Sequence, residues 1–172
     1  MNIQVERYIK RSSKMSKTKL SDIVLTDERT AIDIIQHFSP TGLVLDPCMG
    51  EGAFYNNFPG EKDWCEITKG RDFLIYEKHA DWIISNPPWS NMVPFLIKGL
   101  SICDNLVYYI PTEGIWTKAR VNLTQEMGFG LKELYFPHPD LYKWGKTISA
   151  CYWQRGYEGP TNIGRFRYDT DI

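Results

Sequence analysis

Hydrogen-bond acceptors and an aromatic ring meet in four consecutive residues, Asn86-Pro87-Pro88-Trp89. Two prolines in a row lack amide donors and fix φ, so they end a strand and leave rigidly aimed carbonyl groups. An amino group conjugated to a base ring is a poor nucleophile. If the Asn86 side-chain oxygen and the Pro87 carbonyl both accept its hydrogen bonds, they stabilise the charge growing on nitrogen by roughly 3–4 kcal/mol each. Trp89 can stack on a planar base for about 1–3 kcal/mol.

A second motif is a glycine-containing turn. The apolar run Leu43-Val44-Leu45 is followed by Asp46-Pro47-Cys48-Met49-Gly50-Glu51-Gly52-Ala53-Phe54. Gly50 and Gly52 let the backbone approach a ligand closely, as a nucleotide-like cofactor requires. The dinucleotide fingerprint needs a third glycine where the chain has Tyr55, so NAD is disfavoured. Because ordinary tight turns also use glycine pairs, this motif indicates a cofactor only together with the first one.

Short apolar runs alternate with helical patterns along the chain. Apolar runs without polar alternation predict strands buried on both faces of a parallel sheet, and apolar residues three to four positions apart predict helices. The alternation predicts an α/β Rossmann-like fold, with a mostly parallel central sheet and helices on both faces. The expected strands cover 43–45, 82–84, 106–110, 134–136 and 150–153, and the expected helices cover 26–38, 92–102 and 117–127.

The two motifs follow two of these strands. In an open α/β sheet, ligands bind beyond the carboxyl ends of the strands. Asp46 follows one apolar run, and Asn86 follows Asp81-Trp82-Ile83-Ile84-Ser85. If both strands are parallel, the cofactor turn and the amine-binding residues lie at one edge of the sheet. The alternative for the second motif is a Pro-Pro loop with a core tryptophan.

Composition limits the classes of protein to consider. At 172 residues, with 42% hydrophobic residues, the chain has room for one domain with a substantial core. No apolar run approaches the roughly 20 residues that cross a bilayer, and no signal-peptide core is present, so we expect a cytoplasmic protein without a membrane partner. The cysteines form no C-x-x-C pair, so we expect buried free thiols and no metal site. They are Cys48, Cys65, Cys103 and Cys151.

Three parts are expected along the chain. Residues 1–20 hold six Lys/Arg against Glu6 alone. They are expected to form a basic, flexible extension, which can contact phosphates or serve only as a solvated leader. Residues 21–156 form the expected catalytic domain, and residues 157–172 an irregular C-terminal tail.

The two motifs resemble those of the S-adenosylmethionine-dependent adenine-specific (N-6) DNA methyltransferases, whose pattern is D-P-x-x-G-x-G-x-F followed by N-P-P-[YFW]. The likeness runs from about Thr26 to Ile110. It implies S-adenosylmethionine (SAM) as cofactor and methyl transfer to the exocyclic amino group of adenine in DNA. It also implies that Asn86, Pro87, Pro88 and Trp89 bind the target amine and base. The cofactor-binding set implied by the resemblance is Thr26, Asp46, Pro47, Gly50, Gly52, Phe54, Glu66, Asp72 and Phe73.

Individual roles within that set also follow from the resemblance. Glu66 would bind the ribose hydroxyls, and Asp72 with Phe73 would contact the cofactor adenine. Thr26 resembles the family's N-terminal cofactor segment, although Asp27 replaces the proline expected there.

The chain departs from the family in two respects. Glu66 and Asp72 lie only six positions apart. A crossover helix needs roughly 10 residues or more, so we expect a fold shortened between its second and fourth strands. The chain also lacks the length of a target-recognition domain, which implies a separate recognition subunit, another substrate or loose specificity.

Two further aromatics, Tyr142 and Trp144, precede the last strand of the predicted domain. The family often places a second aromatic against the flipped base in this region. The resemblance therefore makes both residues candidates for substrate binding, with core packing as the alternative.

Other acceptors and another class of protein stay open. The N-P-P-aromatic motif also serves methyltransferases of RNA bases and of protein glutamine amides, although Asp46-Pro47 favours the base-modifying branch. A non-catalytic methyltransferase-fold subunit of a complex is the alternative from another class, but such a subunit has no chemical need for Asn86. Restriction-linked protection, phage self-marking and housekeeping modification look the same at this level.

Overall fold

The computed structural model describes residues 25–137 and 147–165. The expected extension over residues 1–20 lies outside the described residues, as do Tyr142 and Trp144. None of the described helices is long and apolar enough to cross a bilayer.

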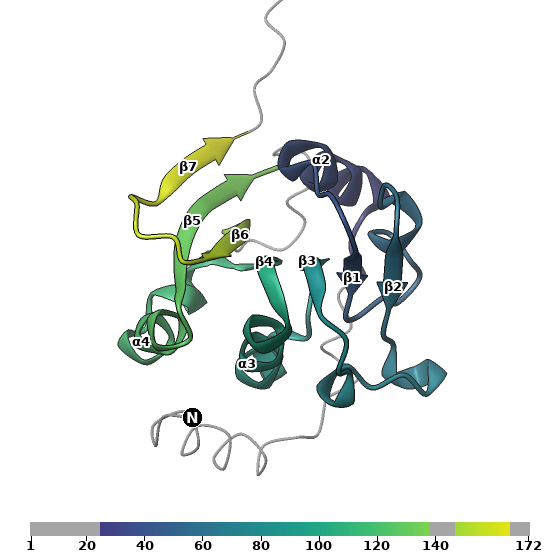
Figure 1. Ribbon diagram of the computed structural model, residues 1–172. Helices are drawn as coiled ribbons and strands as arrows, with labels where there is room; N and C mark the ends of the chain where they lie inside the picture. Colours follow the sequence, from purple (N-terminus) through teal and green to yellow (C-terminus); the bar gives the residue numbers. More distant parts are fainter. Residues whose placement is uncertain (1–24, 138–146, 166–172) are drawn as a thin grey trace, which may run out of the picture.

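One central sheet organises the described chain (Figure 1). Its strands are β1 Val44–Asp46, β2 Lys62–Trp64, β3 Ala80–Ser85, β4 Cys103–Pro111, β5 Phe129–Phe136, β6 Ile148–Arg155 and β7 Asn162–Arg165. The helices are α2 Glu28–Phe38, α3 Met92–Ile102 and α4 Lys118–Glu126. Short 3-10 helices are η2 Tyr55–Asn57, η3 Ile67–Lys69, η4 Phe73–Ile75, η5 Trp89–Asn91 and η6 Thr112–Trp116.

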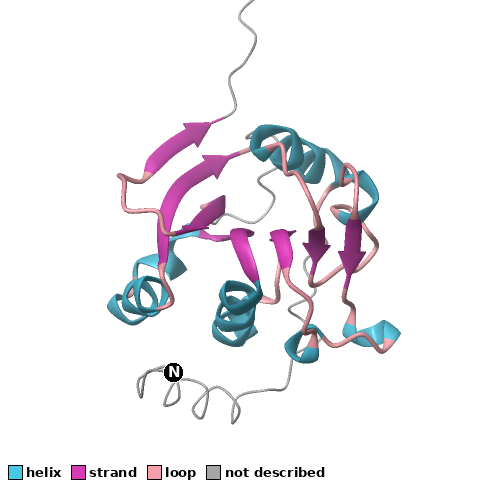
Figure 2. Cartoon of the chain, in the orientation of Figure 1, coloured by secondary structure: helices cyan, strands magenta, loops and turns pink. Residues whose placement is uncertain are grey.

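The strands lie in the order β2-β1-β3-β4-β6-β5-β7. The first four strands in this order are parallel, β6 runs antiparallel to both of its neighbours, and β7 is parallel to β5. One face of the sheet is covered by α2 and the other by α3 and α4 (Figure 1, Figure 2). The predicted α/β architecture, with a mostly parallel sheet between helices, is confirmed.

Apolar clusters fill both faces of the sheet. On one side, Ala31 and Ile34 of α2 pack with Val44 of β1. On the other side, Leu96 of α3 packs with Leu106 of β4. Because β1, β3 and β4 are covered on both faces, their residues form continuous apolar runs, and this pattern made them recognisable in the sequence.

The helix α2 begins and ends with recognisable capping groups. The Asp27 side chain accepts a hydrogen bond from the Arg29 amide at 3.0 Å, which satisfies a backbone donor in the first turn. The helix ends at Ser39, which has φ 45 in the left-handed region and whose amide donates to the Ile35 carbonyl. The start of α2 is therefore fixed, and so are the positions of its N-cap Asp27 and of Thr26, the residue before the cap.

The predicted shortening lies between β2 and β3, where the described chain has only η3 and η4. Within residues 25–137 and 147–165 the sheet still has seven strands, because residues 162–165 pair with β5 as β7. The prediction of an irregular tail is therefore wrong for these residues. The strand lacks an apolar pattern, since Ile163 is 74% exposed, and side-chain hydrogen bonds from Thr161 and Asn162 to carbonyl groups of β5 hold it.

The cysteines are free thiols. Cys65, Cys103 and Cys151 are buried as expected, whereas Cys48 is half-buried because it lies in the glycine turn. Burial raises the pKa of Cys65 to about 11 and that of Cys151 to about 12, so both remain protonated at neutral pH.

Candidate active site

The two sequence motifs meet at the carboxyl ends of β1 and β3. These strands are parallel neighbours, with Leu45 paired to Ile83. Asp46 ends β1 and Ser85 ends β3, and the Ser85 hydroxyl donates to Asp46 Oδ1 at 2.7 Å. Asn86 follows Ser85 directly, so one buried hydrogen bond joins the glycine turn to the N-P-P-W turn.

The Asp46 carboxyl group is buried, with 1% of the residue exposed. Its Oδ1 also accepts a hydrogen bond from the Cys48 amide at 3.1 Å, whereas its buried Oδ2 has no partner among the described residues. Burial raises the pKa of Asp46 to about 7, against the lowering effect of the Ser85 hydroxyl and of the Cys48 and Tyr55 backbone amides. Near neutral pH the Asp46 carboxyl group is therefore only partly ionised, and a nearby cation would stabilise its charged form.

The glycine turn has a backbone that only glycine adopts easily. Gly50 has φ 52 and Gly52 has φ 94, both in the left-handed region. A Cβ atom on Gly52 would lie 2.7 Å from Asn56 Nδ2. The turn is also tied to the residues after β2, because the Met49 amide donates to the Cys65 carbonyl at 2.9 Å.

Glu66 supports this turn from the end of β2. Its Oε2 accepts from the Gly50 amide at 2.9 Å, and its Oε1 accepts from the Thr68 amide and hydroxyl at 3.1 and 2.8 Å. Burial alone would raise the pKa of Glu66, but the hydrogen bonds from Thr68 and Gly50 outweigh it and lower the pKa below its ordinary value. Glu66 is therefore ionised at neutral pH, next to the glycine turn.

Other residues of the expected cofactor set have structural contacts. Asp72 accepts a hydrogen bond from the Leu74 amide at 2.9 Å and so caps η4. Phe73 is 2% exposed, and its ring packs against Phe95 with the centroids 5.3 Å apart. Phe54 is buried beneath α2. These contacts belong to the core and its turns, and cofactor contacts at these residues stay predictions.

Exposed apolar side chains flank Glu66 and Asp72 and were missed by the sequence reasoning. Ile67 is 65% exposed, Ile75 is 76% exposed, and Leu74, directly before Ile75, is 38% exposed. An apolar residue directly after an acidic cofactor-binding candidate, as in Glu66-Ile67, is the signal that could have identified this surface.

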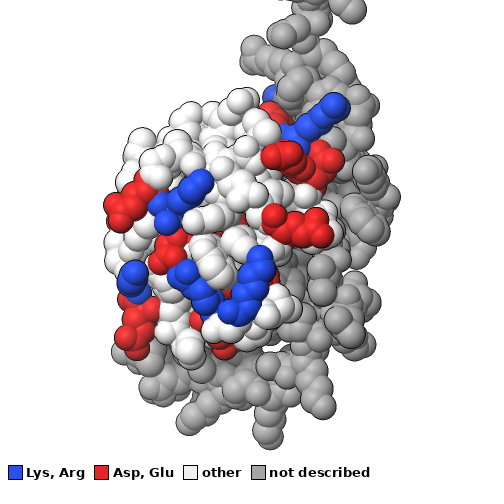
Figure 3. Space-filling model, turned by 90° about the vertical axis from the view of Figure 1, so that its right-hand side faces the viewer, with Lys and Arg blue, Asp and Glu red and all other residues white. Residues whose placement is uncertain are grey.

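Charges on the β2 side of the molecule are mixed (Figure 3). The Arg71 guanidinium lies over the Trp64 ring at 4.2 Å and pairs with Asp63 at 2.6 Å. The Lys69 ammonium donates to the Gly50 carbonyl at 3.2 Å. Among the described residues of this face, these cations are therefore occupied by local partners, and acidic groups are interspersed with them.

The Asn86 carboxamide is held at both ends. Its Nδ2 donates to the Thr26 hydroxyl at 3.2 Å, and its Oδ1 accepts from the Trp89 indole N–H at 3.0 Å. Pro87 is buried, and Pro88 accepts a hydrogen bond from the Asn91 amide at 3.0 Å. The N-P-P-W residues therefore form one braced turn, which contains the two acceptors expected from the sequence.

Trp89 is half-buried and borders a cavity of about 120 Å³ between the sheet, α3 and α4. The indole packs against both apolar clusters, so part of its surface is core. The core alternative considered for this tryptophan is thus partly realised. The cavity is lined by Trp89, Met92, Leu96, Ile110, Pro111, Gly114, Ile115, Arg120, Thr124 and Trp153.

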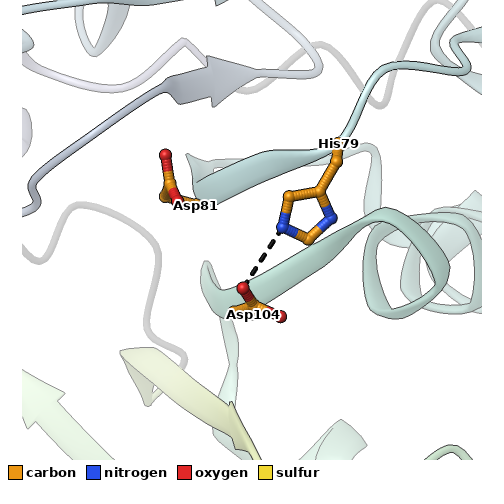
Figure 4. Close-up of side chains that lie close together, drawn as sticks. All are labelled: His79, Asp81 and Asp104. Carbon is orange, nitrogen blue, oxygen red and sulfur yellow. Dashed lines mark hydrogen bonds and ion pairs between the residues drawn. The ribbon is translucent and has the colours of Figure 1, made fainter.

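Among the described residues, one group could provide metal ligands. It lies at the starts of β3 and β4, the ends of these strands that are away from the candidate active site (Figure 4). It consists of His79, Asp81 and Asp104, whose potential ligand atoms lie within 4.8 Å of one another. Asp104 pairs with His79 at 3.2 Å and with Arg155 at 3.0 Å, and Asp81 accepts from the Leu43 amide at 2.7 Å. We interpret the group as a pairing network between strand starts, apart from the candidate active site.

The buried Asp46 carboxyl group sets a pH dependence of stability. Its pKa is about 7 in the folded chain against an ordinary 3.8, so between these values the folded state holds a proton that the unfolded state has lost. The free energy of unfolding therefore falls as pH rises from about 4 to about 7. We expect Asp46→Asn to remove this fall and to be the more stable protein at about pH 8, by at most about 4 kcal/mol.

Thermal melts of the parent and Asp46→Asn between about pH 5 and pH 8 measure this difference. Glu66→Gln is the matched contrast, because the pKa of Glu66 is lowered and its removal should instead reduce the Tm at the higher pH. Parallel Tm curves for the parent and Asp46→Asn would show that the Asp46 charge is not suppressed in the folded protein.

Methyltransferases of known structure share this fold. The chain has no match among protein-family models and none among curated proteins. A proposed class I SAM-dependent methyltransferase from Listeria monocytogenes is 12% identical with a TM-score of 0.62, over 99% of this chain and 76% of that one. Magnesium protoporphyrin IX methyltransferase from Synechocystis with bound SAM is 13% identical with a TM-score of 0.59, over 90% of this chain and 92% of that one.

A subunit of a restriction-modification enzyme also shares this fold. The modification subunit of a proposed type I restriction enzyme from Vibrio vulnificus is 12% identical with a TM-score of 0.57, over 100% of this chain but 54% of that one. Identities this low show a common fold and no more. The chain has the Rossmann-like fold of class I S-adenosylmethionine-dependent methyltransferases.

Proposed function

We propose that the chain is a methyltransferase that uses SAM to methylate the exocyclic amino group of adenine in DNA. The observation that carries this proposal is the braced Asn86 carboxamide, which lies at the same sheet edge as Asp46 and is joined to it through Ser85. This arrangement combines acceptors for an amino group with a carboxylate suited to a positively charged cofactor.

The residues at the end of β1 fit SAM. When bound, SAM supplies an electrophilic methyl group on a positively charged sulfur, and its methionine end carries an ammonium group. The buried Oδ2 of Asp46 has no partner among the described residues, so a cation there would recover the hydrogen bonding and charge that burial removes. Gly50 and Gly52 have no side chains, so a cofactor could approach the backbone of this turn closely.

The residues after β2 fit the nucleoside end of SAM. A carboxylate offers about four acceptor positions, and the Gly50 amide, the Thr68 amide and the Thr68 hydroxyl take three of them, so Glu66 Oε2 can accept from one ribose hydroxyl. The exposed side chains of Ile67, Leu74 and Ile75 would cover the adenine ring. Burial of those side chains by the ring would stabilise the complex by roughly 25 cal/mol per Å² of apolar surface.

The chemistry at the amine depends on Asn86 and Pro87. Their oxygens would accept hydrogen bonds from the two N–H groups of the target amino group. They would stabilise the positive charge that develops on nitrogen as it bonds to the methyl carbon and the methyl–sulfur bond breaks. No general base with a tuned pKa is needed, because the extra proton can leave to water after the methyl group has arrived. The role of the protein is thus to hold the nitrogen in place and to favour its charged state.

Trp89 would supply the surface on which the target base rests. Base–aromatic stacking is worth roughly 1–3 kcal/mol, and a base inside a duplex must first be flipped out at a cost of a few kcal/mol. A second aromatic at Tyr142 or Trp144 stays a prediction, since both lie outside the described residues.

DNA is the acceptor favoured by the combined motifs. Asp46-Pro47 before the glycines is typical of the base-modifying branch of these methyltransferases. The chain covers 54% of the Vibrio vulnificus modification subunit, and a separate partner for target recognition is part of the proposal. An RNA base or a protein glutamine amide would need the same acceptors at Asn86, and product analysis separates these substrates.

Removal of the amine acceptor should lower the rate of methyl transfer, and removal of the stacking surface should weaken DNA binding. We expect Asn86→Ala to lower kcat for DNA methylation by about 10²- to 10³-fold, because one preorganised acceptor is lost. Trp89→Ala should mainly raise KM for DNA, by roughly ten- to a hundredfold. Transfer of labelled methyl groups to unmethylated DNA measures both effects, with Ser90→Ala as a control from the same turn and circular dichroism as the test of folding.

Equal DNA methylation by the parent and by folded Asn86→Ala and Trp89→Ala variants would rule out the proposed roles of both residues.

Affinity for SAM should depend on the ionisation of Asp46. Because the pKa of Asp46 is about 7 without a ligand, a positively charged cofactor binds best once the carboxyl group has lost its proton. We expect SAM to bind the parent more tightly than Asp46→Asn, with an advantage that grows from about pH 6 to pH 8. Calorimetric titration of both proteins measures this ratio.

A constant affinity ratio would contradict contact between Asp46 and the cofactor charge. No SAM binding by the parent at any pH would instead support the non-catalytic subunit.

A further inference from the structure

We propose that Thr26 is a positioning residue, which holds the Asn86 carboxamide in the orientation that the amine chemistry requires. The proposal rests on the proposed function and assigns a new role within the same site. The resemblance placed Thr26 in the cofactor segment, whereas its hydroxyl in the structure contacts the Asn86 side chain at 3.2 Å.

The chemistry of the two partners determines which way the carboxamide points. An indole N–H only donates, so the Asn86 atom that lies 3.0 Å from Trp89 Nε1 must be the oxygen. The Nδ2 group then faces Thr26, whose hydroxyl can accept. If the carboxamide were turned over, its NH₂ group would face the indole N–H, and two donors would oppose each other.

The position of Thr26 is itself fixed by the fold. Thr26 directly precedes Asp27, which caps α2, and α2 is anchored in the core by Ala31 and Ile34. The neighbouring Leu25 lies against the glycine turn, since a Cβ on Gly50 would be 3.7 Å from its Cδ2. The chain segment before α2 therefore borders both the cofactor turn and the amine-binding turn.

The Thr26 contact affects the acceptor strength of Asn86 as well as its orientation. Donation from Nδ2 polarises the amide and strengthens Oδ1 as an acceptor, by roughly 10–30% for each bond in a hydrogen-bonded chain. It is a second restraint on the carboxamide beside the indole N–H of Trp89. A carboxamide without this contact would present NH₂ to the target amine for part of the time and would lose the favourable interaction.

Two substitutions separate this role from a cofactor contact. Thr26→Val keeps the shape and removes the acceptor, and Thr26→Ser restores the acceptor without the methyl group. We expect Thr26→Val to lower the single-turnover rate at saturating SAM and DNA by about tenfold, the size expected for one hydrogen bond. The SAM Kd should change by less than about twofold, and Thr26→Ser should methylate at close to the parent rate.

A weaker SAM affinity with an unchanged saturated rate in Thr26→Val would overturn the proposal in favour of a cofactor contact. Equal rates for the parent and Thr26→Val would also overturn it.

The side-chain amide signals of Asn86 in ¹⁵N NMR give a test that needs no activity. They are assigned by their loss in Asn86→Ala. We expect Thr26→Val to shift these signals and to speed exchange of the Nδ2 protons with water, and Thr26→Ser to restore the parent values. Unchanged signals in Thr26→Val would show that Thr26 does not hold Asn86. If the signals change but the parent methylates no DNA, the positioning contact stands and the proposed substrate fails.

Discussion

The hydrogen bond from the Ser85 hydroxyl to the Asp46 carboxyl group connects the two halves of the candidate site. Both residues are buried, at the ends of parallel strands that lie next to each other in the sheet. The site therefore depends on the pairing of β1 with β3. Any change in their register would separate the glycine turn from Asn86 and would leave the buried polar groups without partners.

The same burial gives the site its electrostatic character. Asp46 is held in the core with one oxygen unpartnered among the described residues, and its pKa is raised to about 7. Such a group destabilises the ligand-free protein and is retained where a ligand compensates it. Glu66 shows the opposite case, since several hydrogen bonds stabilise its charge and fix the glycine turn. The site thus combines Asp46, whose charge is disfavoured by burial, with Glu66, whose charge is stabilised by hydrogen bonds.

Much of the fold could be predicted, because strands covered on both faces form apolar runs. The helix α3 covers the expected range 92–102, in agreement with its apolar spacing. The edge strands β2 and β7 were not predicted from the sequence. Their residues, such as Lys62 and Ile163, pair through the backbone at the edges of the sheet and do not form buried apolar runs. In the site, residue types identified Asp46 and Asn86. Their contacts with Ser85 and Thr26 span 39 and 60 positions, and sequence spacing carries no information about such partners.

The most direct test of the account is the identity of the methylated product. The protein is incubated with methyl-labelled SAM together with unmethylated DNA, RNA or glutamine-containing protein, and the acceptors are hydrolysed and analysed. The account predicts label in N6-methyladenine from DNA, dependent on Asn86. Label confined to RNA nucleosides or to protein glutamine, or the same label in DNA with Asn86→Ala, would contradict it.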